Sequence, residues 1–210
     1  AVEERISLRH LYGLPSDAFI LVAGSTRTGK DQQIIDVYRA LLIKYANIFL
    51  VIVPRHPQRA GDIESLAKQS GLVVRRRTSF PDGCPSYQQP GEVFLVDTIG
   101  ELMKMYLLAD IVFVGGSLVP KGGHNLLEPA SLGVPSLFGQ YTTNFREATA
   151  LVLTYEAGIR VDSEVALTEA CLKLIDNEAE RRRLGKNGLQ MLSENGGATE
   201  RHLEVIGRYL

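Results

Sequence analysis

The interpretation of this chain depends on one stretch, Gly115-Gly116-Ser117-Leu118-Val119-Pro120-Lys121-Gly122-Gly123-His124-Asn125-Leu126-Leu127-Glu128-Pro129. It follows the apolar run 111–114, which is typical of a strand buried on both faces, and it leads into a short helix that ends near Gly133. Its two Gly-Gly pairs leave backbone N–H groups unshielded, and a helix start carries partial positive charge. The stretch therefore predicts one wall of an anion site, which we interpret as a nucleotide-sugar site.

Asn125 and Glu128 are three residues apart, so both side chains are expected on one face at the start of this helix. A capping box, in which Glu128 bonds only the backbone amide of Asn125, is a common use of this spacing. The capping box leaves unexplained why two Gly-Gly pairs enclose a loop that carries Lys121 and His124. We therefore favour the interpretation as a binding site.

Composition is that of a soluble globular chain: 210 residues, 45% hydrophobic and 22% charged, with a net charge of −1. We expect a single domain over residues 1–210 and no nucleic-acid partner. The two cysteines form no CxxC pair, so no disulfide scaffold is expected. The longest apolar run, 48–53, is too short to span a bilayer, and no signal peptide is recognisable. Because the chain begins without Met at Ala1, we expect it to be part of a longer protein.

Apolar runs and helical spacing alternate along the whole chain. Strands are expected at 19–23, 48–53, 72–74, 93–96, 111–114, 134–138 and 159–161, and helices at 3–11, about 34–42, 63–69, 99–108, 145–155, 165–175, 179–194 and 198–210. The segment 78–91 is expected to be an irregular loop. Continuous apolar strands that alternate with helices predict an α/β fold, a Rossmann-like doubly wound parallel sheet.

Polar clusters follow the predicted strands, at the carboxyl edge where ligands of such sheets bind. The candidate residues for binding the nucleotide sugar, as the donor of a sugar, are Ser25, Arg55, His56, Thr98, Ile99, Gly100, Glu101, Gly115, Gly116, Ser117, Lys121, Gly123, His124, Asn125 and Glu128. Arg55 follows a buried strand between two prolines, and an arginine there offers two parallel hydrogen bonds to a phosphate. Residues 97–101 form either a simple N-cap with a capping box or a turn whose amides bond a base or phosphate.

The segment 24–30 matches the pattern GxxxxGK between a predicted strand and a helix, as a phosphate-binding P-loop requires. However, Asp31 stands where that motif needs Ser or Thr, and only 93–97 resembles the strand that ends in a magnesium-binding aspartate. We favour a turn that places Ser25 and Thr26 near the ligand. No His or Cys spacing typical of a metal site is present, so no metal is expected.

Five motifs, in collinear order, resemble the C-terminal half of the 3-deoxy-D-manno-octulosonic acid (Kdo) transferases. They are 54–57, 96–102, 115–117, 122–129, and 133–139 with 144–147, and the resemblance covers about residues 18–161. It implies the donor-binding lobe of a GT-B glycosyltransferase, with CMP-Kdo as substrate and no cofactor or metal. The alternatives are a related GT-B transferase that uses a UDP-sugar, a P-loop nucleotide-binding protein, and a non-enzymatic nucleotide-sensing Rossmann module.

The resemblance also implies roles for the candidate residues. Arg55 would engage the anionic groups of the donor, the amides near 99–101 would hold the cytosine or phosphate, and Glu128 would bond the ribose hydroxyls. Residues 115–117 and 123–125 would surround the phosphate. One departure from the family pattern stands out: Arg27 occupies the place of a usual histidine, and Lys30 that of an acidic residue.

The partner lobe of the intact enzyme is not recognisable in this chain. By resemblance, that lobe would hold the catalytic base, the lipid A precursor and the membrane contact, so no catalytic residue is assigned here. The intact enzyme is expected at the cytoplasmic face of the inner membrane, acting in lipopolysaccharide synthesis. The present chain is expected to be soluble, and to bind donor without transferring sugar.

Overall fold

A computed structural model describes residues 2–80 and 90–196. Seven strands form one sheet in the order β3-β4-β2-β1-β5-β6-β7, and every neighbouring pair is parallel. The strands are β1 (Phe19–Thr26), β2 (Ile48–Pro54), β3 (Val73–Arg76), β4 (Glu92–Leu95), β5 (Ile111–Val114), β6 (Ser136–Phe138) and β7 (Gly158–Arg160). The predicted doubly wound parallel sheet is confirmed.

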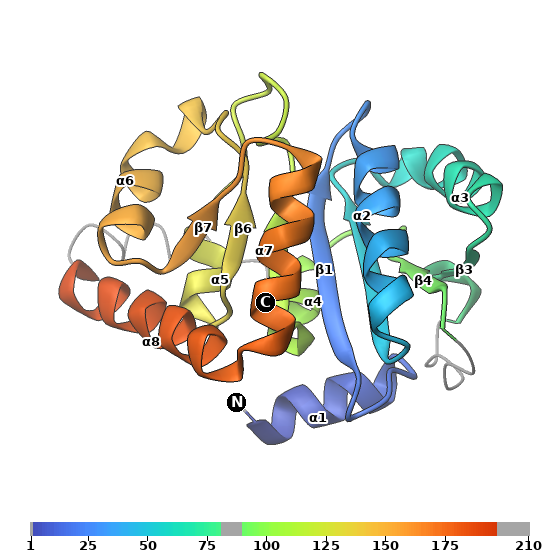
Figure 1. Cartoon of the computed structure of the whole chain (residues 1–210), viewed down its shortest axis with the longest axis horizontal. Coiled ribbons are helices and arrows are strands. Elements are labelled where there is room, and N and C mark those ends of the chain that lie inside the picture. The colour runs from blue at the N-terminus through green and yellow to red at the C-terminus, as the bar shows by residue number, and fades with distance from the viewer. Residues whose placement is uncertain (1, 81–89, 197–210) are drawn as a thin grey trace.

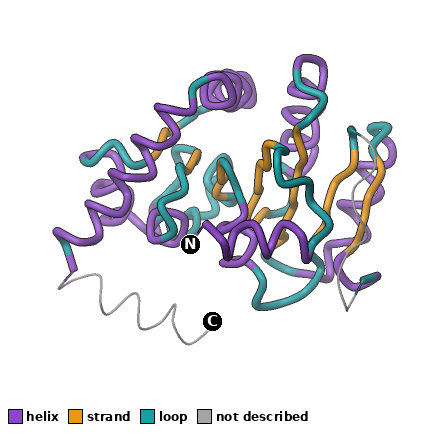
Figure 2. The backbone as a smooth tube through the Cα atoms, turned by 90° about the horizontal axis from the view of Figure 1, so that it is seen from below, coloured by secondary structure: helices purple, strands orange, loops and turns teal. Residues whose placement is uncertain are grey.

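Helices cover both faces of the sheet (Figures 1 and 2). They are α1 (Val2–Leu11), α2 (Asp31–Lys44), α3 (Ala60–Gln69), α4 (Leu102–Leu108), α5 (Leu127–Ser131), α6 (Arg146–Thr154), α7 (Glu164–Asp176) and α8 (Glu178–Glu194), with 3-10 turns at Pro57–Arg59, Arg77–Ser79 and Thr143–Phe145. Buried residues of α2, α3 and α7 pack on one face of the sheet. Those of α4, α5 and α6 pack on the other, so the sheet is enclosed as its apolar strands require.

Several predicted boundaries differ from the structure, and three of them differ for a clear local reason. The first strand continues through Ser25 to Thr26, because its pairing with β2 resumes after a register shift. Helix α4 begins at Leu102 and not at Ile99, since Gly100 has a φ of +89° that no helix contains. Strand β6 begins after Pro135, which has no N–H to donate. The predicted helix 198–210 and most of the predicted loop 78–91 lie outside the described residues.

Helix α1 is held at the amino-terminal edge of the sheet by two arginines. The buried Arg9 guanidinium donates to the Leu108 carbonyl through Nη2 (2.9 Å) and to Asp110 Oδ2 (2.8 Å). Asp110 also accepts the backbone N–H of Ile20 at 2.7 Å, and Arg5 pairs with it at 2.5 Å. Asp110 therefore joins α1, the start of β1 and the end of α4, at the edge opposite the polar clusters.

Gly115 is expected to be intolerant of substitution. A Cβ added to Gly115 would lie 2.6 Å from the Ser25 carbonyl oxygen and 2.8 Å from that of Gly24, both in the neighbouring strand. Backbone cannot move aside as a flexible side chain can, so Gly115→Ala should lower the free energy of unfolding by about 1–3 kcal/mol in urea titration. The control is Gly61→Ala on α3, whose nearest non-local atom, Arg76 Nη2, is 3.7 Å away. An equal loss in both variants would contradict the packing argument.

Candidate functional site

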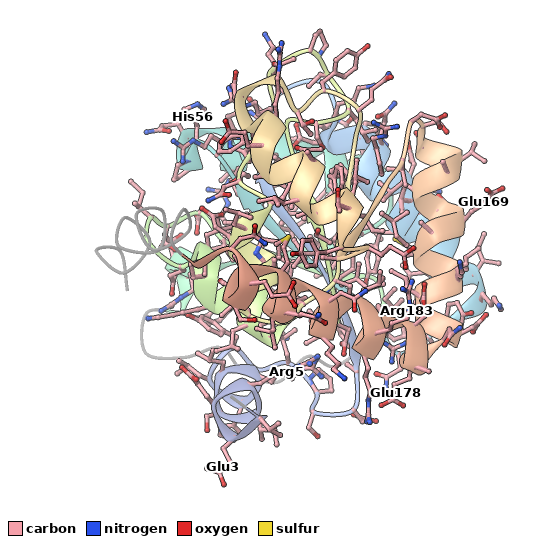
Figure 3. All side chains as sticks on the ribbon, turned by 90° about the vertical axis from the view of Figure 1, so that its left-hand side faces the viewer. Glu3, Arg5, His56, Glu169, Glu178 and Arg183 are labelled. Atoms are coloured by element: carbon pink, nitrogen blue, oxygen red, sulfur yellow. The ribbon has the colours of Figure 1, made fainter. Side chains whose placement is uncertain are left out.

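The candidate residues meet at the carboxyl edge of β1, β2, β4 and β5. The strand arrows of Figure 1 point toward this edge, and α1 lies at the other end. Figure 3 shows the same separation, with His56 far from Glu3 and Arg5 of α1. The four loops that follow these strands therefore lie along one edge of the sheet, although their residues are distant in sequence.

The turn after β1 and the end of β2 are tied to each other. Ser25 has a φ of +53°, and the carbonyl of Thr26 accepts the backbone N–H of Arg55 (3.0 Å) and Nη1 of Arg59 (3.1 Å). Arg59 also pairs with the buried Asp31 in the first turn of α2. The side chains of Arg55 and His56 are exposed just beyond this joint. The two residues are therefore held by backbone on one side and are open to a ligand on the other.

The glycine-rich turn after β5 folds back on itself. Gly123 donates its N–H to the carbonyl of Gly116 at 3.1 Å, and both glycines have φ near +70°. His124 consequently lies beside Gly116 and accepts a hydrogen bond at Nε2 from Nε of Arg27 (3.1 Å). Lys121 is exposed at the tip of the turn. Arg27 is a residue that sequence reasoning did not include in the site.

Two titratable groups of the site have strongly shifted pKa values. Burial, reinforced by the positive charges of Arg27 and Arg55, lowers the pKa of His124 to about 4. Burial also raises the pKa of Glu128 to about 7, although Arg55 opposes that shift. His124 is thus neutral near pH 7, and Glu128 is poised between its two forms, as is typical of functional sites.

Ser117 has a structural role in this arrangement. Its hydroxyl is fully buried, donates to the Val114 carbonyl (2.6 Å) and accepts the N–H of Gly139 (2.8 Å), while its carbonyl accepts the N–H of Tyr141 (2.9 Å). The loops after β5 and β6 are thereby joined. The Ser117 hydroxyl is therefore engaged within the fold, and the contact of Ser117 with a donor stays a prediction.

The capping box that we considered for Asn125 and Glu128 is not formed. Asn125 Oδ1 accepts the N–H of Leu127 at 3.1 Å, and Glu128 accepts no hydrogen bond from Asn125 within the described chain. Helix α5 has only five residues, so its dipole adds less to an anion site than the predicted helix would. The half-buried Glu128 carboxylate is therefore free to bond a ligand.

The turn at 97–101 divides into a structural part and an open part. The Glu101 carboxylate bonds the hydroxyls of Thr98 and Tyr12 (2.8 Å from Tyr12) and pairs with Arg77 at 3.0 Å, so its side chain serves the fold. Ile99 is 87% exposed, and Gly100 beside it is exposed as well. The exposed residues 99–100 are therefore the part of this turn that is available for the predicted contact with a base or phosphate.

A cavity of about 300 Å³ adjoins the glycine-rich turn, and it was not predicted from the sequence. It is lined by Asn125, Leu127, Thr143, Asn144, Phe145, Arg146, Glu147 and Ala148. Gly122 makes the approach of this second loop possible, because a Cβ there would lie within 2.4 Å of the Asn144 amide group. The N–H of Asn144 bonds the Gly122 carbonyl at 3.1 Å. The motif 144–147 was the available signal, but its place beside Asn125 follows only from the fold.

The geometry at residues 24–30 does not support P-loop chemistry. The neighbours of β1 are β2 and β5, and these strands are followed by Arg55 and Gly115, not by a carboxylate that could bind magnesium. Asp31 places a paired carboxylate where a phosphate would have to lie. Within residues 2–80 and 90–196, no cluster of three His, Cys, Asp or Glu side chains is arranged to hold a metal ion. In the same ranges, no helix is both long and apolar enough to cross a bilayer.

Comparison with known proteins finds relatives of this chain and a solved domain of similar fold. No protein-family model matches the sequence. The chain is 40% identical to the 3-deoxy-D-manno-octulosonic acid transferase of Haemophilus influenzae, over 97% of this chain and 47% of that protein. It is 32% identical to the transferase of that name from Aquifex aeolicus, over 80% of this chain and 45% of that protein. The solved C-terminal CMP-Kdo binding domain of WaaA from Acinetobacter baumannii is 26% identical, with a TM-score of 0.81, over 91% of this chain and 97% of that domain.

The fold is that of the C-terminal half of a GT-B glycosyltransferase. Within that class the chain is related to the 3-deoxy-D-manno-octulosonic acid transferases, which confirms the resemblance seen in its motifs. The chain spans about half the length of these curated transferases.

Proposed function

We propose that this chain is the donor-binding lobe of an inverting Kdo transferase, and that it binds CMP-Kdo without a metal ion. The observation that carries the proposal is the match to nearly the whole of a solved domain named for CMP-Kdo binding. The exposed side chain of Arg55 supports it, because CMP-Kdo is anionic.

In the intact enzyme, we propose, Kdo passes from CMP-Kdo to a lipid A precursor in lipopolysaccharide synthesis, at the cytoplasmic face of the inner membrane. A second lobe would supply the catalytic base, the acceptor site and the membrane contact. The acceptor oxygen forms the new bond as the bond between Kdo and the CMP phosphate breaks. The departing phosphate gains negative charge, which cations and amides positioned in advance stabilise.

We propose the following roles for residues of this lobe, from the resemblance to the family. Arg55 would bind the phosphate through its guanidinium, and the turns 115–117 and 123–125 would surround the same group. The amides of Gly115 and Gly123 would not take part, because they are bonded to the carbonyls of Gly24 and Gly116. The exposed amides of 99–100 would contact the cytosine. In its ionised form, the Glu128 carboxylate would accept hydrogen bonds from the ribose hydroxyls.

Calorimetric titration of the chain with CMP, UMP and Mg-ATP tests this proposal. We expect CMP to bind in the presence of a chelator and more tightly than UMP. Tighter binding of UMP would favour a transferase that uses a UDP-sugar. Binding of Mg-ATP that disappears in Lys30→Ala would favour a P-loop protein. Absence of CMP binding would contradict the proposal.

A further inference from the structure

The contact between Arg27 and His124 suggests a function for a residue outside the predicted site. Arg27 follows β1, and His124 lies in the loop between β5 and α5. Nε of Arg27 and Nε2 of His124 are 3.1 Å apart, in a partly buried contact. A Cβ on Gly116 would lie 3.1 Å from His124 Cδ2 and 3.4 Å from Arg27 Cδ. The pair is therefore packed against the glycine turn.

The chemistry of the two side chains determines where the imidazole proton lies. Arginine stays protonated in proteins, so its Nε can only donate, and His124 Nε2 has to accept. A neutral imidazole that accepts at Nε2 carries its single proton on Nδ1. A second proton would turn Nε2 into a donor facing a donor. The charged and titratable groups around the imidazole, Arg27, Arg55 and His56, also disfavour the cation.

We propose that Arg27 is a positioning residue, which fixes His124 in the Nδ1–H tautomer so that this N–H donates to an anionic oxygen of the bound nucleotide. The inference rests on the proposed function. Nδ1 of His124 has no hydrogen-bond partner among residues 2–80 and 90–196. His124 then serves as a neutral donor whose contact with the ligand is unchanged between pH 6 and 8, while Arg27 and Arg55 supply the positive charge.

Nuclear magnetic resonance can test the tautomer directly in the free chain. Long-range proton–nitrogen correlation spectra of the nitrogen-15-labelled protein report which ring nitrogen carries the proton, and His124→Gln assigns the signals by their loss. We expect a protonated Nδ1 and an unprotonated Nε2 from pH 6 to 8. Arg27→Gln retains an N–H donor without the charge and should keep this pattern. Arg27→Met should lose it.

Lys30→Met is the matched control, because it removes one positive charge from the same loop without touching His124. It should leave the tautomer unchanged. CMP, but not cytidine, should shift the Nδ1 proton signal, and Arg27→Met should weaken CMP binding about tenfold or more.

A protonated Nε2 in the native chain, or an unchanged tautomer in Arg27→Met, would overturn the inference. A response to cytidine equal to that to CMP would overturn the phosphate contact. Because the tautomer is measured without ligand, the inference can fail while native CMP binding still supports the proposed function. If the native chain binds no CMP, the proposed function fails whatever the tautomer.

Discussion

Replacing Arg55 by alanine is expected to weaken CMP binding by about 10- to 100-fold, the usual range for a lost hydrogen bond to a charged group. The side chain is exposed at the end of β2, whereas its backbone N–H is bonded to Thr26. Truncation should therefore remove the phosphate contact without disturbing the joint between β1 and β2. Calorimetry at constant pH and salt measures the effect.

Arg160→Ala is the matched control for this prediction. Arg160 is an exposed arginine that ends β7, at the same edge of the sheet but three strands away from β1. Its removal changes the net charge equally and should leave CMP binding almost unchanged. Similar losses in both variants would mean that the edge attracts CMP by its overall charge alone, which would contradict a specific contact at Arg55.

Glu128→Gln is expected to weaken CMP binding. In the absence of ligand, it is also expected to raise the free energy of unfolding relative to the native chain, and to raise it more as the pH increases. The pKa of Glu128 rises from 4.5 to about 7 on folding, so the folded state binds the proton more tightly than the unfolded state does. Stability of the native chain therefore falls as the pH increases from about 4.5 to about 7. The glutamine variant avoids this loss, which amounts to about 1–3 kcal/mol for a partly buried group.

Urea unfolding at pH 5 and pH 8 measures this difference. The gain in Glu128→Gln relative to the native chain should be larger at pH 8 than at pH 5. Glu147→Gln is the control, since Glu147 is an exposed carboxylate on the adjoining helix α6. The same pH-dependent gain in both variants, or none in Glu128→Gln, would contradict burial of the Glu128 carboxylate as the cause.

The sheet was predictable because each strand is a short apolar run separated from the next by a helix. The wrong boundaries occur where backbone conformation, and not hydrophobicity, determines where an element begins or ends. Gly100 ends the turn before α4 with a positive φ, and β1 passes through Ser25 because β2 continues to pair with it. Neither boundary is marked by a change in the spacing of apolar residues, so neither can be inferred from that spacing.

The sequence predicted which edge of the sheet carries the candidate residues, but only some of their contacts. Strand ends located Arg55, His124 and Glu128 at one edge, since parallel strands bring their carboxyl ends together. The bonds that occupy Ser117 and Glu101 could not be foreseen, because their partners Gly139, Tyr12 and Arg77 come from other parts of the chain. The pairing of Arg27 with His124 likewise depends on two loops that meet only in the folded protein.

The central position of β1 has a consequence for the order in which the protein assembles. β1 can pair with β2 early, but its other edge stays open until β5, which begins at Ile111, has been synthesised, 85 residues after β1 ends at Thr26. Such an apolar, unpaired edge invites association between nascent chains, and non-local pairing of this kind folds slowly. Once closed on both sides, β1 should hold the amide hydrogens that exchange last with deuterated water.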